Sequence, residues 1–296
     1  MIVNREMILN GQLSANGLRG VGANSGGGAG GSVYLVVGRL TGNGKIQANG
    51  GNGDLPAGGG GAGGRITVDF STNQFQGNIE VMGGSGVQNG GAGSIFLKAK
   101  TNSVGQVLTE NGPNTGGLTT IGDVSLPYDL TVGNGVALIL PASNQNLRNL
   151  TITSNGLLTI IPTNSFYHRT INLNVSGHFV VDAGGVISLD GCNLAFTVGT
   201  GASNSSSLYG YTGGGGGHGG MGGASINNAA GGLTDGSITV VANSVGGRGG
   251  GHPTLGGAGG GHLRLNITSN FVVNGTITAN GKEGIVPGSG GGAGGG

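Results

Sequence analysis

Short segments in which apolar and polar residues alternate recur along the chain, and many follow a glycine-rich stretch. Residues 32 to 37 read Ser-Val-Tyr-Leu-Val-Val, and residues 65 to 70 read Arg-Ile-Thr-Val-Asp-Phe. An alternation with a period of two predicts β-strands with one buried face. We therefore expect an all-β fold with almost no α-helix, because glycine and β-branched residues both disfavour helices.

In the glycine-rich parts these segments repeat with a period of about 30 to 35 residues, which is typical of a repeat architecture. Equivalent motifs contain Ala29, Ala62 and Ala92 near the start of the chain, and Ala258 and Ala293 near its end. Each interval contains one alternating segment, an Asn-Gly step and a run of glycine. Asn and Gly suit such a turn because both tolerate a positive φ.

Residues 101 to 200 hold only 13 of the 75 glycines and show a shorter repeat. Leu130, Leu150 and Leu173 begin successive copies of the same alternating pattern. We therefore expect a bare coil of about 20 residues, at the short end of known repeat units. In the other parts we expect each coil to carry an additional segment composed mostly of glycine. This excursion leaves the coil at the Asn-Gly turn and returns at the next strand.

Superposing the repeats aligns aliphatic residues in two columns, with variable polar residues between them. A β-solenoid requires such columns, because one coil cannot bury its own inner face and only stacked coils form a core. The expected architecture is one continuous β-solenoid with parts at residues 1–99, 100–200 and 201–296. The first column comprises Leu13, Ile46, Ile79, Ile187 and Ile277, and the second comprises Val33, Ile66, Ile95, Ile238 and Leu263.

The glycine runs recur in register, which favours an ordered layer over floppy loops. Extended helices with three residues per turn can pack side by side where only glycine permits close approach of the backbones. Main-chain hydrogen bonds would then satisfy the buried peptide groups. We also expect asparagines of successive coils to stack as ladders. The expected glycine layer includes Gly28, Gly30, Gly61, Gly63, Gly91, Gly257, Gly259 and Gly292.

Composition narrows the functional classes. Of 296 residues, 75 are glycine and 8% are charged, which is unlike an ordinary globular enzyme. Collagen is excluded because the glycines follow no three-residue repeat, and disorder is disfavoured because 35% of the residues are hydrophobic. The net charge is +1 with no basic patch, so nucleic acid is not an expected partner.

No apolar run is long enough to span a membrane, and the first residues lack the apolar core of a secretory signal. Either a signal was removed or the chain is a piece of a longer one.

The polar residues predict no catalytic, cofactor-binding or metal-binding site. His218 and His262 lie in glycine runs without a carboxylate or thiol within a few residues. Asp182 and Asp190 are close in sequence, but the positions equivalent to Asp190 in other coils hold asparagine rather than a titratable group. Cys192, the single cysteine, is interpreted as a buried small hydrophobe.

Two motifs resemble a known class of protein. Residues 44 to 50 read Gly-Lys-Ile-Gln-Ala-Asn-Gly, and residues 59 to 68 read Gly-Gly-Gly-Ala-Gly-Gly-Arg-Ile-Thr-Val. Together with Gly-Gly-Gly-His-Gly-Gly at residues 215 to 220, they resemble the glycine-rich repeat regions of large secreted or surface microbial proteins. The runs are also similar to the packed polyglycine helices of some phage tail-tip adhesins and of a glycine-rich antifreeze protein. The resemblance implies an extracellular or cell-surface scaffold or adhesin, and no enzyme.

The leading hypothesis is an extracellular structural protein whose copies, or repeats, stack head to tail into a surface fibre or filament. Joining the two ends would place Ala293 of one copy before Ala29 of the next at a spacing that matches the internal repeat. The alternative is an adhesin that binds a receptor, a cell surface or a glycan. The local concentrations of aromatic residues that would support it are Phe166, Tyr167, Tyr209 and Tyr211. Ice binding is disfavoured because the outward positions Gln12, Lys45, Asn78 and Thr276 form no regular array.

Overall fold

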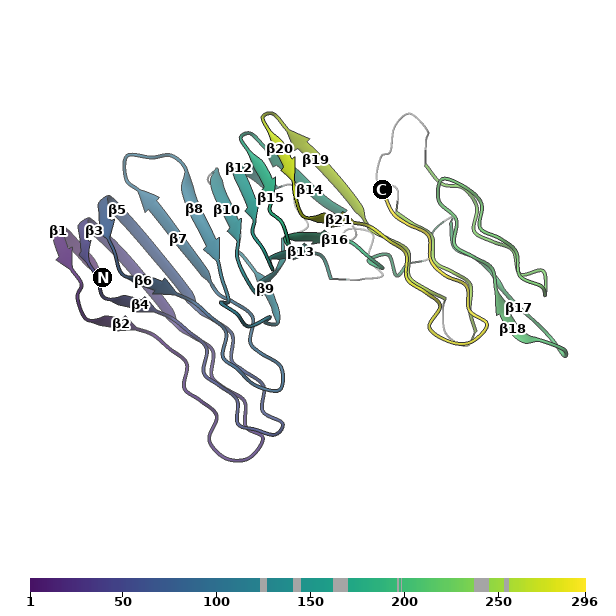
Figure 1. Ribbon diagram of the computed structural model, residues 1–296, viewed down its shortest axis with the longest axis horizontal. Coiled ribbons are helices and arrows are strands. Elements are labelled where there is room, and N and C mark those ends of the chain that lie inside the picture. Colours follow the sequence, from purple (N-terminus) through teal and green to yellow (C-terminus); the bar gives the residue numbers. More distant parts are fainter. Residues whose placement is uncertain are drawn as a thin grey trace.

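The computed structural model is all-β, as predicted, and its described part contains no helix (Figure 1). It describes residues 1–122, 127–140, 145–161, 170–195, 197, 199–236, 245–252 and 256–296. Long strands line up across the molecule, shorter strands follow them, and pairs of extended glycine-rich segments project from the short strands (Figure 1).

The largest sheet contains eleven strands and is almost entirely parallel. The order of the strands across this sheet follows their order in the chain. The strands in order are β1 (Ile2–Ile8), β3 (Ser32–Gly42), β5 (Arg65–Phe75), β7 (Ser94–Ala99), β8 (Gly105–Thr109), β10 (Tyr128–Val132), β12 (Gln145–Ile152), β14 (Thr170–Val175) and β19 (His262–Ile267), with β15 (Phe179–Val181) beside β12 and β20 (Phe271–Val273) beside β15.

Two further parallel sheets consist of three-residue strands, each of which follows a strand of the largest sheet in the chain. The remaining sheet is an antiparallel hairpin of β17 (Ser203–Ser206) and β18 (Gly210–Gly213). One short sheet has the order β2 (Gln12–Ser14), β4 (Lys45–Gln47) and β6 (Asn78–Glu80); the other has the order β9 (Leu118–Thr120), β11 (Ala137–Ile139), β13 (Leu157–Thr159), β16 (Val186–Ser188) and β21 (Thr276–Thr278).

The strand register follows the repeat of the sequence. In the glycine-rich part Val33 pairs with Ile66, and Ile66 pairs with Ile95, as the longer interval predicts. In the glycine-poor part Leu130 pairs with Leu150, as the shorter interval predicts. One long strand, the short strand after it and the segment leading to the next long strand therefore make one repeating unit.

The predicted alignment of Leu150 with Leu173 is wrong. Leu173 on β14 pairs with Gln145, and Leu150 pairs with Phe179 on β15. The reason is that β12 runs unbroken past two successive strands, since the chain turns aside at residues 176–178 between β14 and β15. The repeating unit is therefore longer here than between Leu130 and Leu150.

Among the described strands of the long sheet, direction reverses between β7 and β8, which pair antiparallel. At the same place the core changes from one face of the long sheet to the other. Ile95 belongs to the core of the first units, whereas its neighbour Phe96 packs against the core of the later units beside Val107. Because adjacent strand residues point to opposite faces, the two cores lie on opposite faces of the long sheet. Reversed direction with an exchanged face amounts to a half-turn about the long axis.

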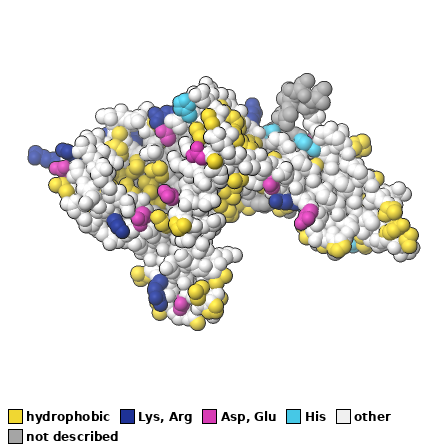
Figure 2. Space-filling view, in the orientation of Figure 1, with side chains coloured by type: hydrophobic (Ala, Val, Ile, Leu, Met, Phe, Trp, Pro, Cys, Tyr) yellow, Lys and Arg dark blue, Asp and Glu magenta, His cyan; other side chains and the backbone are white. Residues whose placement is uncertain are grey.

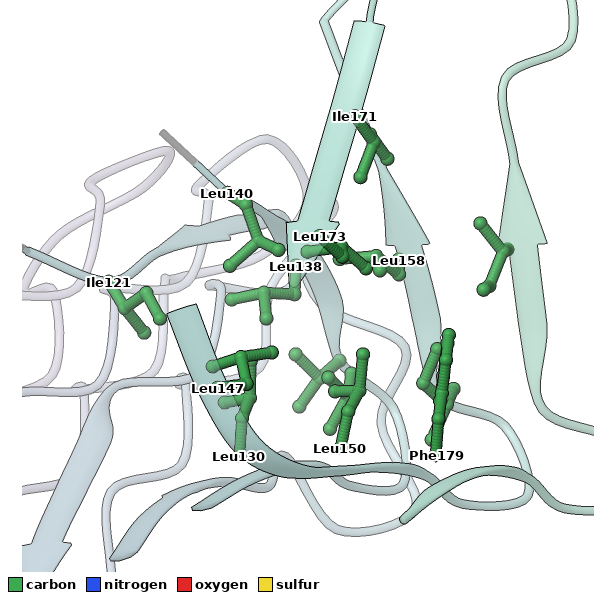
Figure 3. Packing of buried hydrophobic residues seen from close by; sticks show 14 of the residues in the cluster. Ile121, Leu130, Leu138, Leu140, Leu147, Leu150, Leu158, Ile171, Leu173 and Phe179 are labelled. Atoms are coloured by element: carbon green, nitrogen blue, oxygen red, sulfur yellow. The ribbon is translucent and has the colours of Figure 1, made fainter. Parts of the chain in front are cut away.

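Each core fills the space between the long sheet and one short sheet. The first core includes Leu35, Ile46 and Ile66, all fully buried. In the second core Leu130, Leu150 and Phe179 lie in a row on successive strands, with Leu138 and Leu158 of the short sheet facing them (Figure 3). A unit in the middle of the stack therefore buries its apolar face against the units on both sides.

Replacing Ile46 with alanine should lower the free energy of unfolding by about 2–5 kcal/mol, the usual effect of a cavity at a fully buried aliphatic site. Ile46 is 0% exposed, whereas its neighbour Lys45 is exposed. Urea unfolding followed by circular dichroism measures both, with Lys45→Ala as the matched control. Equal stability of Ile46→Ala and Lys45→Ala would contradict burial of this column.

Candidate functional site

The residues of the two predicted columns differ in burial according to their position in the stack. Buried members lie on inner strands, and the half-buried ones lie on strands at the edge of a sheet. An edge strand has a neighbour on one side only, so its inner face is half covered. Ile238 lies outside the described residues. The buried members are Val33, Ile46, Ile66, Ile95 and Ile187, and the half-buried ones are Leu13, Ile79, Leu263 and Ile277.

The same columns show the predicted pairing where the structure describes it. Leu13 pairs with Ile46 and Ile46 with Ile79. Ile187 pairs with Ile277, which lies in a distant part of the sequence. Leu263 differs, because its partner is Ile171 on β14.

The long sheet has an open edge at each end, and both edges expose apolar side chains. At one end β1 exposes Ile2 and Ile8 beside the polar residues Asn4, Arg5 and Glu6. At the other end β20 exposes Phe271, Val272 and Val273. At each end of the sheet, half-buried apolar residues on the inner face pack against the nearest core. At the β1 end these are Val3, Met7, Leu9, Leu13 and Ala15, and at the other end they are Leu263, Leu265, Ile267, Ile277 and Ala279.

Glycine-rich segments of the first units form three hairpin-like arms, which we name the first arm (residues 15–31), the second arm (48–64) and the third arm (81–93). Main-chain bonds from the second arm recur at every third position. Gly60 and Gly63 donate to the third arm, while Gly61 and Gly64 donate to the outgoing half of their own arm. Successive donors therefore point to different neighbours, and each extended segment bonds to more than one other.

Close contact between these segments leaves little room for side chains. A Cβ added at Gly63 would overlap the carbonyl oxygen of Val81, and one at Gly61 would overlap that of Gly28. Gly28 itself differs from the expectation, since a Cβ there would lie 3.4 Å from the backbone of Leu18, an ordinary contact. The other predicted glycines whose Cβ would come within 3.0 Å of the backbone of another segment are Gly30, Gly91, Gly257, Gly259 and Gly292.

At the base of the arms, asparagine side chains form hydrogen bonds between one unit and the next. The Asn16 Oδ1 accepts a hydrogen bond of 2.7 Å from the Asn49 N–H, and the Asn49 Oδ1 accepts one of 2.8 Å from the Met82 N–H. The carboxylate of Asp190 does the same for the Asn280 N–H at 2.6 Å. Asp190 therefore takes the place of an asparagine and acts as a structural acceptor.

A second group of packed glycine segments surrounds Arg248, which the sequence analysis does not single out. Gly246 donates to Gly260, Gly260 to Ala293, and Ala293 back to Gly247, at 2.8–3.0 Å. The Arg248 side chain is 6% exposed, and its guanidinium donates to the carbonyl oxygens of Leu194 and Gly256. Burial lowers the pKa of this guanidinium from its usual range. In the sequence, the one indication of this buried position is that Arg248 stands alone inside a glycine run.

The described residues contain no group of three His, Cys, Asp or Glu side chains that could hold a metal ion. In the same part of the chain, no helix has the length and apolar character needed to cross a membrane. Charged side chains are scattered over the visible face rather than gathered (Figure 2). Comparison of the chain with protein-family models, curated proteins and solved structures found no match.

Replacing Gly63 with alanine should destabilise the protein by about 1–3 kcal/mol, because the new methyl group overlaps a main-chain oxygen. Gly28→Ala is the matched control in the same kind of segment, and its stability should stay within about 0.5 kcal/mol of the wild type or rise slightly. Thermal unfolding by calorimetry compares the two. Equal losses in both variants would show that contact between arms does not decide the effect.

The buried Cys192 thiol should resist modification. Burial, with the nearby charge of Asp190, raises its pKa from 9.0 to about 11. The folded state therefore favours the neutral thiol, and this contribution to stability is complete below pH 9 and lost as the pH rises toward 11. Ellman's reagent at pH 8 should react with Cys192 only after unfolding in urea. A pH titration of stability for wild type and Cys192→Ala should diverge above pH 9.

Proposed function

We propose that the chain is an extracellular structural protein, a β-solenoid whose copies stack head to tail into a fibre. The observation that carries this proposal is the pair of open strand edges at the two ends of the long sheet. Parallel strands with unpaired backbone groups are ready templates for another strand. Each edge also leaves one inner face half covered, and stacking would cover it.

Geometry favours one way of stacking. The half-turn between the two halves of the chain means that β1 and β19 run in opposite directions and have their cores on opposite faces. A second copy rotated by half a turn about the long axis would therefore place its β1 parallel to β19 of the first. Val3 and Met7 would then continue the core formed by Leu265 and Ile267, and the same contact could repeat without limit.

The glycine arms suit a mechanical role in this proposal, since they could hold successive units of the fibre together. Hydrogen-bond donors that change neighbour along the chain and recur at every third position are the pattern expected of packed three-residue-per-turn helices. Such a layer is held by main-chain groups, so each arm braces the next along the fibre axis. The extracellular location rests on the resemblance of the repeats to secreted and surface microbial proteins.

An adhesin is the second candidate, and one feature favours it. The β17–β18 hairpin exposes Leu208, Tyr209 and Tyr211, and apolar side chains gather at that tip of the molecule (Figure 2). Phe166 and Tyr167 lie outside the described residues. Electron microscopy distinguishes the candidates, because a fibre protein forms filaments whereas an adhesin remains a discrete particle.

Proline substitutions test the two edges separately. The Leu9 N–H donates to β3 and the Asn274 N–H donates to β15, so the N–H groups of the preceding residues, Ile8 and Val273, point away from the sheet. Proline removes a donor without a change in net charge. Ile8→Pro and Val273→Pro should each abolish filaments, since both edges enter every junction. Ile8→Thr and Val273→Thr keep the N–H and serve as matched controls that still assemble.

A mixing experiment decides whether the contact is head to tail. Each proline variant keeps one intact edge, so an equimolar mixture should form dimers and nothing larger in analytical ultracentrifugation. Contact between identical edges would behave differently, because one of the two variants alone would still dimerise. That result, or a wild type that stays monomeric at high concentration, would overturn the proposal.

A further inference from the structure

A shallow groove of about 180 Å³ lies on the outer face of the long sheet and reaches the edge strand β19. It crosses β12, β14 and β19 where β14 and β19 end. Its polar lining consists of amides and hydroxyls, and its apolar lining consists of Pro127, Leu147 and Val175. The polar side chains are Asn146, Asn174, Ser176, Asn266 and Thr268.

Three of these residues form a ladder of amides across neighbouring strands. Asn146 pairs with Asn174, and Asn174 pairs with Asn266. The Asn174 Nδ2 donates to the Asn146 Oδ1 at 3.0 Å, and the Asn266 Nδ2 donates to the Asn174 Oδ1 at 3.4 Å. The amides are therefore held in one orientation, one strand spacing apart.

The ladder leaves hydrogen-bonding capacity free on each amide. An amide nitrogen carries two hydrogens and an amide oxygen has two lone pairs, while each ladder bond uses one of each. The hydroxyls at the end of the groove are anchored as well. The Thr268 Oγ1 donates to the Ser176 carbonyl oxygen at 2.8 Å, which leaves the lone pairs of the Thr268 hydroxyl able to accept. Groups fixed in advance lose little conformational entropy when they bind a ligand.

The lining of the groove offers a charged ligand no partner of opposite charge. No side chain of the lining is charged. The nearest cation on β12, Arg148, forms an ion pair with Asp129, whose hydrogen bond raises the pKa of the Arg148 guanidinium. Arg264 lies two residues before Asn266 on β19 and outside the lining. Paired donors and acceptors without charge suit a ligand rich in hydroxyl groups.

We propose that this groove binds a neutral oligosaccharide. Adjacent strands lie about 4.8 Å apart, close to the length of one hexopyranose residue in an extended polysaccharide. Successive sugar residues could therefore meet successive asparagines of the ladder. Vicinal hydroxyls would donate to the free amide lone pairs and accept from the free amide hydrogens, and the apolar face of a sugar ring would pack on Pro127. The proposal does not depend on stacking of copies.

Isothermal titration calorimetry with three hexasaccharides tests it: cellohexaose and mannohexaose, which are neutral, and hexagalacturonate, which is anionic. At least one neutral probe should bind at millimolar concentration or below, and more tightly than the anionic probe. Asn174→Leu should weaken that binding by about tenfold, the effect of losing one or two hydrogen bonds. Asn172→Leu, on the same strand and outside the groove lining, should bind as the wild type does.

Thr268→Val is a second variant, nearly isosteric, that removes one hydroxyl and keeps the ladder. It should also weaken binding, with an unchanged circular dichroism spectrum, so a folding defect in Asn174→Leu would not decide the matter. The proposal is overturned if no neutral probe binds at millimolar concentration, if the anionic probe binds more tightly, or if Asn172→Leu and Asn174→Leu lose affinity equally.

Discussion

A unit of this chain has one long strand, one short strand and too little apolar surface to form a core alone. Main-chain hydrogen bonds to the units on either side place its inner face against theirs, and the core exists only because of that stacking. Strand register, the columns of Ile and Leu, and the asparagine contacts all repeat the spacing that these bonds impose. Half-buried residues such as Leu13 and Ile277 mark where the stacking stops.

The same bonds account for the composition. Between the arms, main-chain atoms of one segment lie where a side chain of another would stand, as at Gly63 and Val81. Glycine is therefore required by contact, and only a few positions need it for a positive φ, such as Gly42 and Gly184. The alanines of the runs have different surroundings, since Ala29 and Ala62 are exposed whereas Ala92 is buried in the second core.

Much of the fold could be predicted because its signals are local or strictly periodic. Alternation identified the strands, and a regular interval aligned Val33 with Ile66 and Ile95. Prediction failed where the interval changes: Leu173 was misaligned because β14 and β15 both lie beside β12, and Leu263 pairs with Ile171 from a distant part of the sequence. The half-turn at β7–β8 has no sequence signal of this kind, since both faces of β7 are apolar there. The groove was missed because its asparagines, scattered in sequence, meet only through register.

The reliance on peptide groups has a consequence for the conditions that the protein tolerates. Within the described residues two ion pairs occur, Arg39 with Glu6 and Arg148 with Asp129, and both lie at the surface. Peptide groups neither titrate in water nor attract counterions strongly, and salt screens charges rather than amides. The stability of a body held mainly by such groups should therefore depend little on salt concentration, from fresh water to brine. Its composition therefore suits the molecule to surroundings whose ionic strength varies.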